Sequence, residues 1–233
     1  MRVVEIFDSI DGEGKRTGQG ATFIRLAGCN LRCSYCDTLY ALYGEKEPCV
    51  YEEMSVQDIL QRVNTNFKRV TLTGGEPLIH PNVDELVREL LKMGVEVNIE
   101  TNGAADISAM NALRAELKAQ GYAENQLFLT IDYKLISSGE SGKMLWSNFE
   151  QLREFDVVKF VVGSDADFDL MVSTAQKMSE IYTKMPLIYT GVVFGAYEPR
   201  KLVERMLAEP ALKDAFCQMQ IHKIIWNPEE RGV

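Results

Sequence analysis

Three cysteines, Cys29, Cys33 and Cys36, lie within eight consecutive positions. Thiolates can ligate an iron–sulfur cluster, and a [4Fe–4S] cluster normally takes four of them. Three ligands leave one iron open, and reactive metal sites keep an open position whereas structural sites are closed. The spacing therefore predicts a reactive [4Fe–4S] cluster, with two alternatives: a zinc site completed by His80 or His222, and thiols that share no ligand.

Strand-like and helix-like segments alternate around these cysteines, which predicts a parallel sheet with crossover helices. Strands are expected at residues 22–26, 69–72, 95–100, 127–131, 157–162, 187–189 and 218–221. Helices are expected at 55–63, between an Asn82 cap and a Gly94 stop, at 106–120, from about 165, and at 200–207. Five or six such units are too few for a closed eight-stranded barrel, so we expect an open, partial barrel with about six parallel strands and a reduced helix set.

Polar and glycine-containing clusters follow four of the expected strands, at residues 29–38, 73–76, 100–103 and 132–134. Ligand sites of parallel α/β sheets lie at the carboxyl ends of their strands. The four clusters are therefore expected to meet at one edge of the sheet and to form the site.

The chain has 233 residues, 46% of them hydrophobic, which suits a single domain over residues 1–233. Its net charge of −9 disfavours nucleic acid as a partner, because an acidic surface repels phosphate. No apolar run approaches the roughly 20 residues of a membrane span, and the N-terminus has no apolar signal core, so a cytoplasmic location is expected. An odd cysteine count in a reducing compartment favours metal ligation, with Cys49 and Cys217 as incidental thiols.

Two segments resemble a known superfamily. Residues 29–37, CNLRCSYCD, are similar to the radical S-adenosylmethionine (SAM) signature, with the aromatic Tyr35 before the third cysteine. Residues 73–77, TGGEP, resemble that superfamily's Gly-Gly-Glu motif, whose backbone and glutamate contact the SAM amino group. Glycines allow a close backbone approach, and a carboxylate accepts hydrogen bonds from an ammonium. The resemblance implies SAM on the open iron and a 5′-deoxyadenosyl radical.

Flanking segments narrow the resemblance to the 7-carboxy-7-deazaguanine synthase family. They are residues 5–14, 23–28, 37–38, 220–226 and 231–233, so the similarity spans nearly the whole chain and is densest at 5–38. It implies a radical SAM lyase that converts 6-carboxy-5,6,7,8-tetrahydropterin to 7-carboxy-7-deazaguanine with loss of ammonia, in the route to queuosine. It also implies Mg²⁺, a homodimer, an N-terminal substrate and cluster loop region at 8–50, and a reducing protein such as flavodoxin or ferredoxin.

The same resemblance implies roles for individual residues. Arg25 pairs with the substrate carboxylate, Glu13 bonds the N–H edge of the pterin, and Thr38 ligates Mg²⁺ through its hydroxyl. Ile10, Asp11, Gly12 and Thr73 are further substrate contacts, and His222 covers the pterin. The implied SAM contacts are Tyr35, Cys36, Asp37, Gly75, Glu76, Asp132, Tyr133, Lys134, Thr190, Gly191, Val192 and Val193. Ordinary structural roles for Arg25, Thr38 and His222 remain alternatives.

Two positions depart from the family pattern. Asp11 stands where most members have Gln, and a carboxylate only accepts hydrogen bonds whereas an amide also donates them. Asp132-Tyr133-Lys134 stands where many members have Ser-Pro-Lys, so the SAM contact there differs.

Two other functions stay open. A glycyl-radical-enzyme activase would share the cluster and SAM, act on a glycine of a partner protein, and present a large open docking face. A non-enzymatic iron–sulfur or zinc binding module would bind metal without cleaving SAM.

Overall fold

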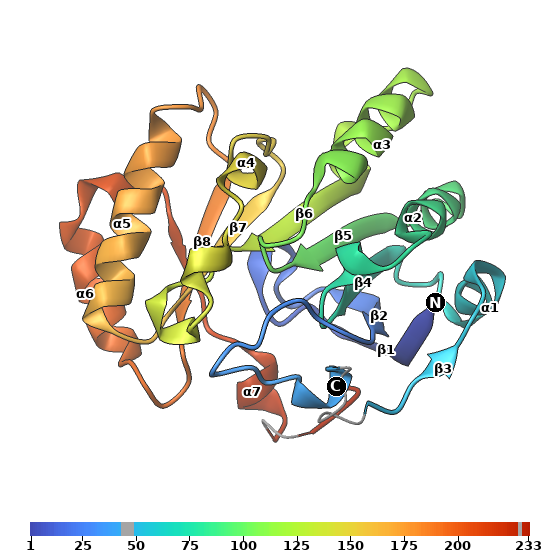
Figure 1. Cartoon of the computed structure of the whole chain (residues 1–233), viewed down its shortest axis with the longest axis horizontal. Helices are drawn as coiled ribbons and strands as arrows, with labels where there is room; N and C mark the ends of the chain where they lie inside the picture. The colour runs from blue at the N-terminus through green and yellow to red at the C-terminus, as the bar shows by residue number, and fades with distance from the viewer. Residues whose placement is uncertain (43–48, 228–229) are drawn as a thin grey trace.

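The computed structural model describes residues 1–42, 49–227 and 230–233. Within these residues nine strands form one sheet in the order β3-β1-β2-β4-β5-β6-β7-β8-β9 (Figure 1). The strands are β1 Arg2–Ile10, β2 Gly20–Leu26, β3 Glu52–Glu53, β4 Arg69–Gly74, β5 Glu96–Thr101, β6 Leu127–Asp132, β7 Val157–Val162, β8 Leu187–Val192 and β9 Phe216–Cys217. The helices are α1 Val56–Arg62, α2 Val83–Lys92, α3 Ser108–Ala119, α4 Trp146–Phe149, α5 Asp165–Ser179, α6 Pro199–Ala208 and α7 His222–Ile225.

Parallel pairing joins β2, β4, β5, β6, β7, β8 and β9 in that order, whereas β1 pairs antiparallel with both β2 and β3. The expected mostly parallel α/β sheet, consistent with a partial barrel, is confirmed. Two expectations about strands were wrong. β1 was missed, and the last strand is Phe216–Cys217 instead of 218–221. Gln218 N still donates to Thr190 O at 2.8 Å, and the Gln218 side chain accepts from Gly14 N at 2.7 Å.

The two faces of the sheet differ in polarity. Alternate residues such as Ile24, Leu72, Ile99, Leu129 and Phe160 are fully buried in the apolar core. Figure 1 shows α2, α3, α5 and α6 along the outside of the curved sheet, where this core lies. Successive side chains of a strand point to opposite faces. The opposite, inner face therefore carries the other residues of the same strands.

Polar residues occupy this inner face at the carboxyl ends of the strands. They include Arg25, which pairs in register with Thr73, Asp132, which pairs with Lys159, and Glu100 of β5. Parallel sheets with both faces covered are usually apolar on both sides. A polar inner face is instead typical of a sheet that holds a ligand there.

Local signals account for several helix ends. Ser55 and Asp58 form the expected capping box at α1, with Ser55 Oγ accepting from Asp58 N at 3.2 Å. The predicted apolar face of α2 is buried, and Gly94, in the left-handed conformation at φ +75°, follows the end of the helix. The predicted cap at Asn82 is wrong, because Asn82 has φ 64° and its side chain makes no capping bond. Among the described residues, no helix is both long and apolar enough to cross a membrane.

Candidate active site

The three cysteines lie on the loop that follows β2, and all three are half-buried free thiols. Burial raises the pKa of the Cys33 thiol to about 11, and the neighbouring Cys36 and Cys29 act in the same direction. The Cys29 sulfur accepts hydrogen bonds from Leu31 N at 3.4 Å and Asn102 Nδ2 at 3.5 Å. Donors aimed at sulfur suit a cluster-bound thiolate, since hydrogen bonds to the sulfurs tune iron–sulfur clusters.

A segment after β6 anchors this cysteine loop from outside. Ser34 N donates to Ser138 O at 2.9 Å, and Ser34 Oγ donates to Ser137 O at 2.5 Å. The nearly buried carboxylate of Glu140 accepts from Arg32 N at 2.7 Å, and Arg32 directly precedes Cys33. Sequence analysis did not single out Glu140, because a contact across 108 positions leaves no local pattern.

The two histidines do not complete a zinc site. His80 Nε2 lies 2.7 Å from Ala27 O, and burial lowers the pKa of His80. His222 packs against Gly12 instead of the cysteines. Within the described residues, no three His, Cys, Asp or Glu side chains gather closely enough for one metal ion. A four-iron cluster spaces its ligands more widely than a single ion does, so the arrangement fits a cluster better than zinc.

The two glycines of residues 74–75 allow β4 to pack against the start of the cysteine loop. A Cβ on Gly74, where φ is +143°, would lie 2.2 Å from Leu26 O, and one on Gly75 would lie 2.1 Å from Gly28 O. Glu76 N donates to Gly28 O at 2.8 Å. Glycine is therefore required at both positions for close packing of the backbone, whether or not these residues also contact SAM.

The Glu76 carboxylate is fully buried and bonded to the protein. It accepts from Leu78 N at 3.0 Å, Thr101 Oγ1 at 2.8 Å and Asn102 N at 2.7 Å. Burial raises the pKa of Glu76 to about 7 even though these donors oppose the shift. The side chain thus joins the ends of β4 and β5, and its contact with the SAM amino group stays a prediction.

Arg25 lies in an aromatic and acidic setting on the inner face. Its Nε is 2.6 Å from Glu5 Oε1, and Tyr40 OH donates to the same oxygen at 2.8 Å. The guanidinium lies 5.7 Å from the ring centre of Phe7 and 5.8 Å from that of Tyr40. Ring faces and a carboxylate fix the plane of the guanidinium, as a bidentate carboxylate receptor requires.

A chain of charges crosses the inner face. Lys159 Nζ lies 3.0 Å from Glu13 Oε2 and 3.2 Å from Asp132 Oδ1, and Lys134 Nζ lies 2.5 Å from Asp132 Oδ2. Burial opposes ionisation of Asp132, but Lys134 and Lys159 outweigh it and hold the pKa of Asp132 below its usual value. Beside this chain, Thr73 Oγ1 donates to Glu100 Oε2 at 2.7 Å. Sequence analysis missed Lys159, whose signal was a charged residue inside an otherwise apolar strand.

Residues 11–19 form a loop that we name the plug loop. The C-terminal segment lies over this loop and over the cysteine loop. Ile221 N donates to Gly12 O at 3.2 Å, and a Cβ on Gly12 would lie 1.9 Å from His222 Nδ1. Lys223 Nζ lies 2.8 Å from Asp37 Oδ2, and Thr38 Oγ1 donates to Asp37 Oδ1 at 2.9 Å. Burial opposes ionisation of Asp37, but Lys223 and Thr38 lower its pKa well below the usual range. Gly12, His222, Asp37 and Thr38 are therefore brought together.

Known proteins resemble this chain over most of its length. Residues 23–125 match the family model described as the radical SAM superfamily. The 7-carboxy-7-deazaguanine synthase of Clostridium acetobutylicum is 43% identical over 100% of this chain and 99% of its own. The enzyme of the same name from Methanospirillum hungatei is 34% identical over 98% of this chain and 86% of its own. The chain belongs to the 7-carboxy-7-deazaguanine synthase family.

Solved structures share the fold of this family member. The crystal structure of QueE from Escherichia coli has a TM-score of 0.68 and 24% identity, over 93% of this chain and 92% of that one. Streptococcus suis SuiB bound to precursor peptide SuiA has a TM-score of 0.58 and 12% identity, over 84% of this chain and 48% of that one. Membership makes the chain a radical SAM enzyme, and that superfamily uses a [4Fe–4S] cluster and SAM.

Asp11 stands where most members of the family have Gln, and its side chain is buried between the plug loop and β4. Its Oδ2 lies 2.9 Å from Arg16 Nε, its Oδ1 accepts from Thr71 Oγ1 at 2.8 Å, and the residue is 2% exposed. Arg16 also donates to Val70 O at 3.3 Å. The carboxylate is thus committed to an ion pair, and any contact between Asp11 and the substrate would run through its backbone. Ile10 ends β1 opposite Gly20.

The expected SAM contacts fall into two groups. Asp132, Lys134 and Tyr35 lie together, and the Tyr35 hydroxyl is buried without a protein partner among the described residues. Burial raises the pKa of Tyr35 to about 12. Gly191 backs onto Gln218 O, and Val193 N donates to Val162 O at 2.9 Å.

The second group points toward the apolar core. The ring of Tyr133 packs on Phe149 and Phe160, at 5.0 Å and 5.7 Å between ring centres. Thr190 and Val192 alternate with Gly191 along β8 and are buried in the same layer as Phe160. These three side chains are therefore placed for packing, and contacts of their residues with SAM would run through the backbone.

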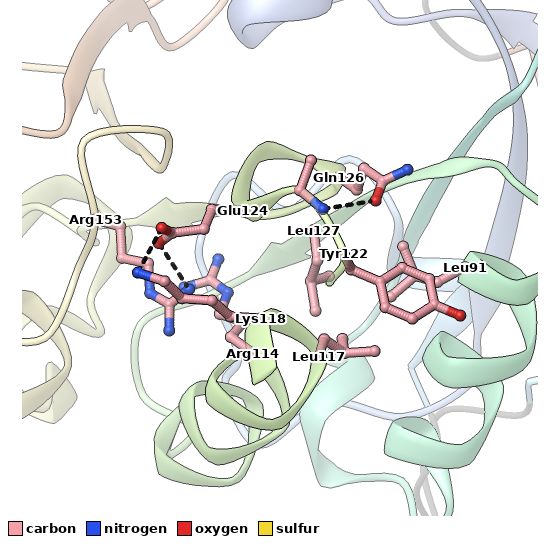
Figure 2. A pocket seen from close by; sticks show the side chains of 10 residues that line it. Leu91, Arg114, Leu117, Lys118, Tyr122, Glu124, Gln126, Leu127 and Arg153 are labelled. Atoms are coloured by element: carbon pink, nitrogen blue, oxygen red, sulfur yellow. Dashed lines mark hydrogen bonds and ion pairs between the residues drawn. The ribbon is translucent and has the colours of Figure 1, made fainter. Parts of the chain in front are cut away.

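A separate surface pocket lies far from the cysteines, at the amino end of β6 (Figure 2). Glu124 lies 2.7 Å from Lys118 and 3.8 Å from Arg153, and Arg114 pairs with Asp156 behind the lining. Apolar Leu91, Leu117 and Leu127 complete the lining.

Proposed function

We propose that this chain converts 6-carboxy-5,6,7,8-tetrahydropterin to 7-carboxy-7-deazaguanine with loss of ammonia. The observation that supports this most is the full-length similarity, 43% over the whole chain, to a protein of that name. The site residues add a chemical argument. The inner face carries a planar cation, Arg25, and the carboxylate of Glu13 reaches the same face through Lys159.

The proposed substrate has a carboxylate at one end and N–H donors at the other. Arg25 binds the carboxylate, because Glu5 contacts its Nε side and leaves the terminal nitrogens for a second carboxylate. Glu13 accepts the N–H donors, and His222 covers the ring from α7. The substrate is thereby held between the plug loop and the strand ends.

The cluster and SAM, when bound, supply the one-electron cleavage that starts the reaction. Cys29, Cys33 and Cys36 would hold the cluster. Asp132, Lys134 and the backbone at Gly75 would hold SAM, and the buried Tyr35 hydroxyl would find a partner there. We also propose that Thr38 offers its hydroxyl oxygen to Mg²⁺, which keeps most of its waters and shares substrate oxygens.

Three further parts of the proposal rest on family similarity. They are a homodimer, a reducing protein such as flavodoxin or ferredoxin as electron donor, and a cytoplasmic location, where thiols stay reduced. A glycyl-radical activase is less well supported, because the C-terminal segment lies over the plug loop and the cysteine loop. A protein substrate requires an open docking face at that place.

The test is an anaerobic assay of the reconstituted enzyme with SAM, a chemical reductant, Mg²⁺ and 6-carboxytetrahydropterin. We expect 7-carboxy-7-deazaguanine by mass spectrometry, and we expect Thr38→Ala to require more Mg²⁺ than wild type. Absence of this product, with a glycyl radical appearing on an added partner protein, would overturn the proposal. An unchanged Mg²⁺ response in Thr38→Ala would remove Thr38 as a ligand.

A further inference from the structure

Lys159 is a buried cation at the centre of the inner face. It is the third residue of β7, it is 9% exposed, and its neighbours in the sheet are Asp132 on β6 and Tyr189 on β8. A buried ammonium is costly unless carboxylates surround it. Lys159 meets this need with Glu13 Oε2 at 3.0 Å and Asp132 Oδ1 at 3.2 Å.

The two carboxylates bound by Lys159 are not equally dependent on it. Asp132 has a second cation, Lys134, at 2.5 Å from its other oxygen. Among the residues that the structure describes, the polar contacts of the Glu13 carboxylate are Lys159 and a long hydrogen bond from Gln218 Nε2 at 3.5 Å. The Glu100 carboxylate also bears on Lys159, so the lysine balances more than one carboxylate. Without Lys159, Glu13 would lose the cation that lies within ion-pair distance of it in the described part of the chain.

We propose that Lys159 is a positioning residue, whose ammonium holds the Glu13 carboxylate in place for the N–H edge of the pterin. The inference rests on the proposed function, in which Glu13 binds that edge. Lys159 also links Glu13, on the plug loop, to Asp132, at the SAM end of the inner face. Because Lys134 still holds Asp132, loss of Lys159 impairs pterin binding far more than SAM binding.

The experiment compares Lys159→Met and Lys159→Arg with wild type in the anaerobic assay. We expect Lys159→Met to raise the KM for the pterin about 10- to 100-fold, the usual range for leaving a buried group unpaired. The Kd for SAM and the iron content should stay within a factor of about three. Lys159→Arg keeps the charge and should recover most of the loss. Lys184→Met, which removes an exposed Lys–Glu pair, is the matched control and should leave the KM unchanged.

A double-mutant cycle with Glu13→Gln tests whether Lys159 acts through Glu13. If it does, Lys159→Met adds less than about threefold to the KM of Glu13→Gln, because the contact is already lost. Equal and additive effects, or an unchanged pterin KM in Lys159→Met, would overturn the inference. If the Lys159 variants fail to fold, Glu13→Gln decides alone, and an unchanged pterin KM rejects the inference. Failure of the proposed function is distinct, since wild type then makes no 7-carboxy-7-deazaguanine.

Discussion

Two buried clusters of charge lie toward opposite ends of the strands. In the first, Arg114 binds Asp156 with both terminal nitrogens, and the side chains are 2% and 1% exposed. Asp156 also accepts from Leu129 N at 2.8 Å and Arg153 N at 2.9 Å. Asp156 directly precedes β7, so this cluster lies at the amino end of that strand, near the pocket of Figure 2 that Arg114 helps to line.

The second cluster, formed by Glu13, Glu100, Asp132, Lys134 and Lys159, lies toward the carboxyl ends of the strands. Its carboxylates outnumber its lysines, and Glu13 has a single cation within ion-pair distance among the described residues. The first cluster closes on itself with backbone donors, which is what stability requires. The second cluster has carboxylate oxygens that can still bind a ligand. The first cluster is therefore a structural ion pair, and the second is a binding site.

Loss of a cluster ligand should produce the largest effect and leave the structural ion pair untouched. Cys33→Ala is expected to lower product formation by at least about a thousandfold, because enzymatic acceleration depends on the cofactor chemistry. The thermal midpoint of the apo protein should barely change, since Cys33 is half-buried. The control is Cys217→Ala, an exposed thiol. Retained iron content and activity in Cys33→Ala would reject the cluster assignment.

Breaking the structural ion pair should reduce stability without changing substrate affinity. Arg114→Met leaves Asp156 buried and unpaired, and we expect a loss of about 3–5 kcal/mol in the free energy of unfolding. The folded fraction should keep the pterin KM of wild type. Arg88→Met removes an exposed bidentate pair with Glu116 and is the control, with little effect. A raised pterin KM in Arg114→Met would show that the Arg114–Asp156 pair also affects substrate binding, and would contradict a purely structural role.

A methyl group on Gly12 should disturb the cover over the second cluster. The added Cβ would meet His222 Nδ1 at 1.9 Å, so the imidazole must move. We expect Gly12→Ala to raise the pterin KM about tenfold, in line with a modest overpacking cost. Gly142→Ala meets nothing within 4 Å and is the control. Equal KM values for the two variants would show that His222 does not cover the substrate.

The Asp11 carboxyl should produce the smallest effect, in the pH dependence of stability. Burial raises the pKa of Asp11 to about 6, although Arg16 and Thr71 oppose the shift. A carboxyl with a raised native pKa binds protons more tightly in the folded state, so its protonation adds stability as pH falls through 6 toward 3.8. Between pH 7.5 and 5 this contribution is about 1 kcal/mol. Urea unfolding of Asp11→Asn should lack this gain, and an identical pH profile would contradict it.

Local patterns in the sequence were sufficient for the cysteine loop and several helix ends. The Ser55–Asp58 box and the apolar face of α2 depend on residues three or four positions apart, so their geometry follows from the sequence pattern. Asn82 shows the limit, since its backbone turns left-handed and its side chain does not cap. The three cysteines are also close in sequence, so their spacing alone predicted a shared cluster.

Long-range pairing accounts for what the sequence did not show. β1 is defined by its antiparallel register with β2, and Lys159 gains its role only when the plug loop brings Glu13 to it across 146 positions. The commitment of Asp11 to Arg16 likewise depends on both side chains being buried beneath β4. Composition and periodicity carry no information on such contacts.

The central claim is that the inner face holds the pterin and SAM side by side. Its most direct test is a single-turnover reaction with 6-carboxytetrahydropterin that carries deuterium at C6. The resemblance to the synthase family implies that the deoxyadenosyl radical takes hydrogen from C6 of the pterin and that this hydrogen returns to regenerate SAM. The account therefore predicts 7-carboxy-7-deazaguanine as product and deuterium in the recovered SAM. Product formed without deuterium in SAM, or SAM cleavage that does not depend on the pterin, would contradict it.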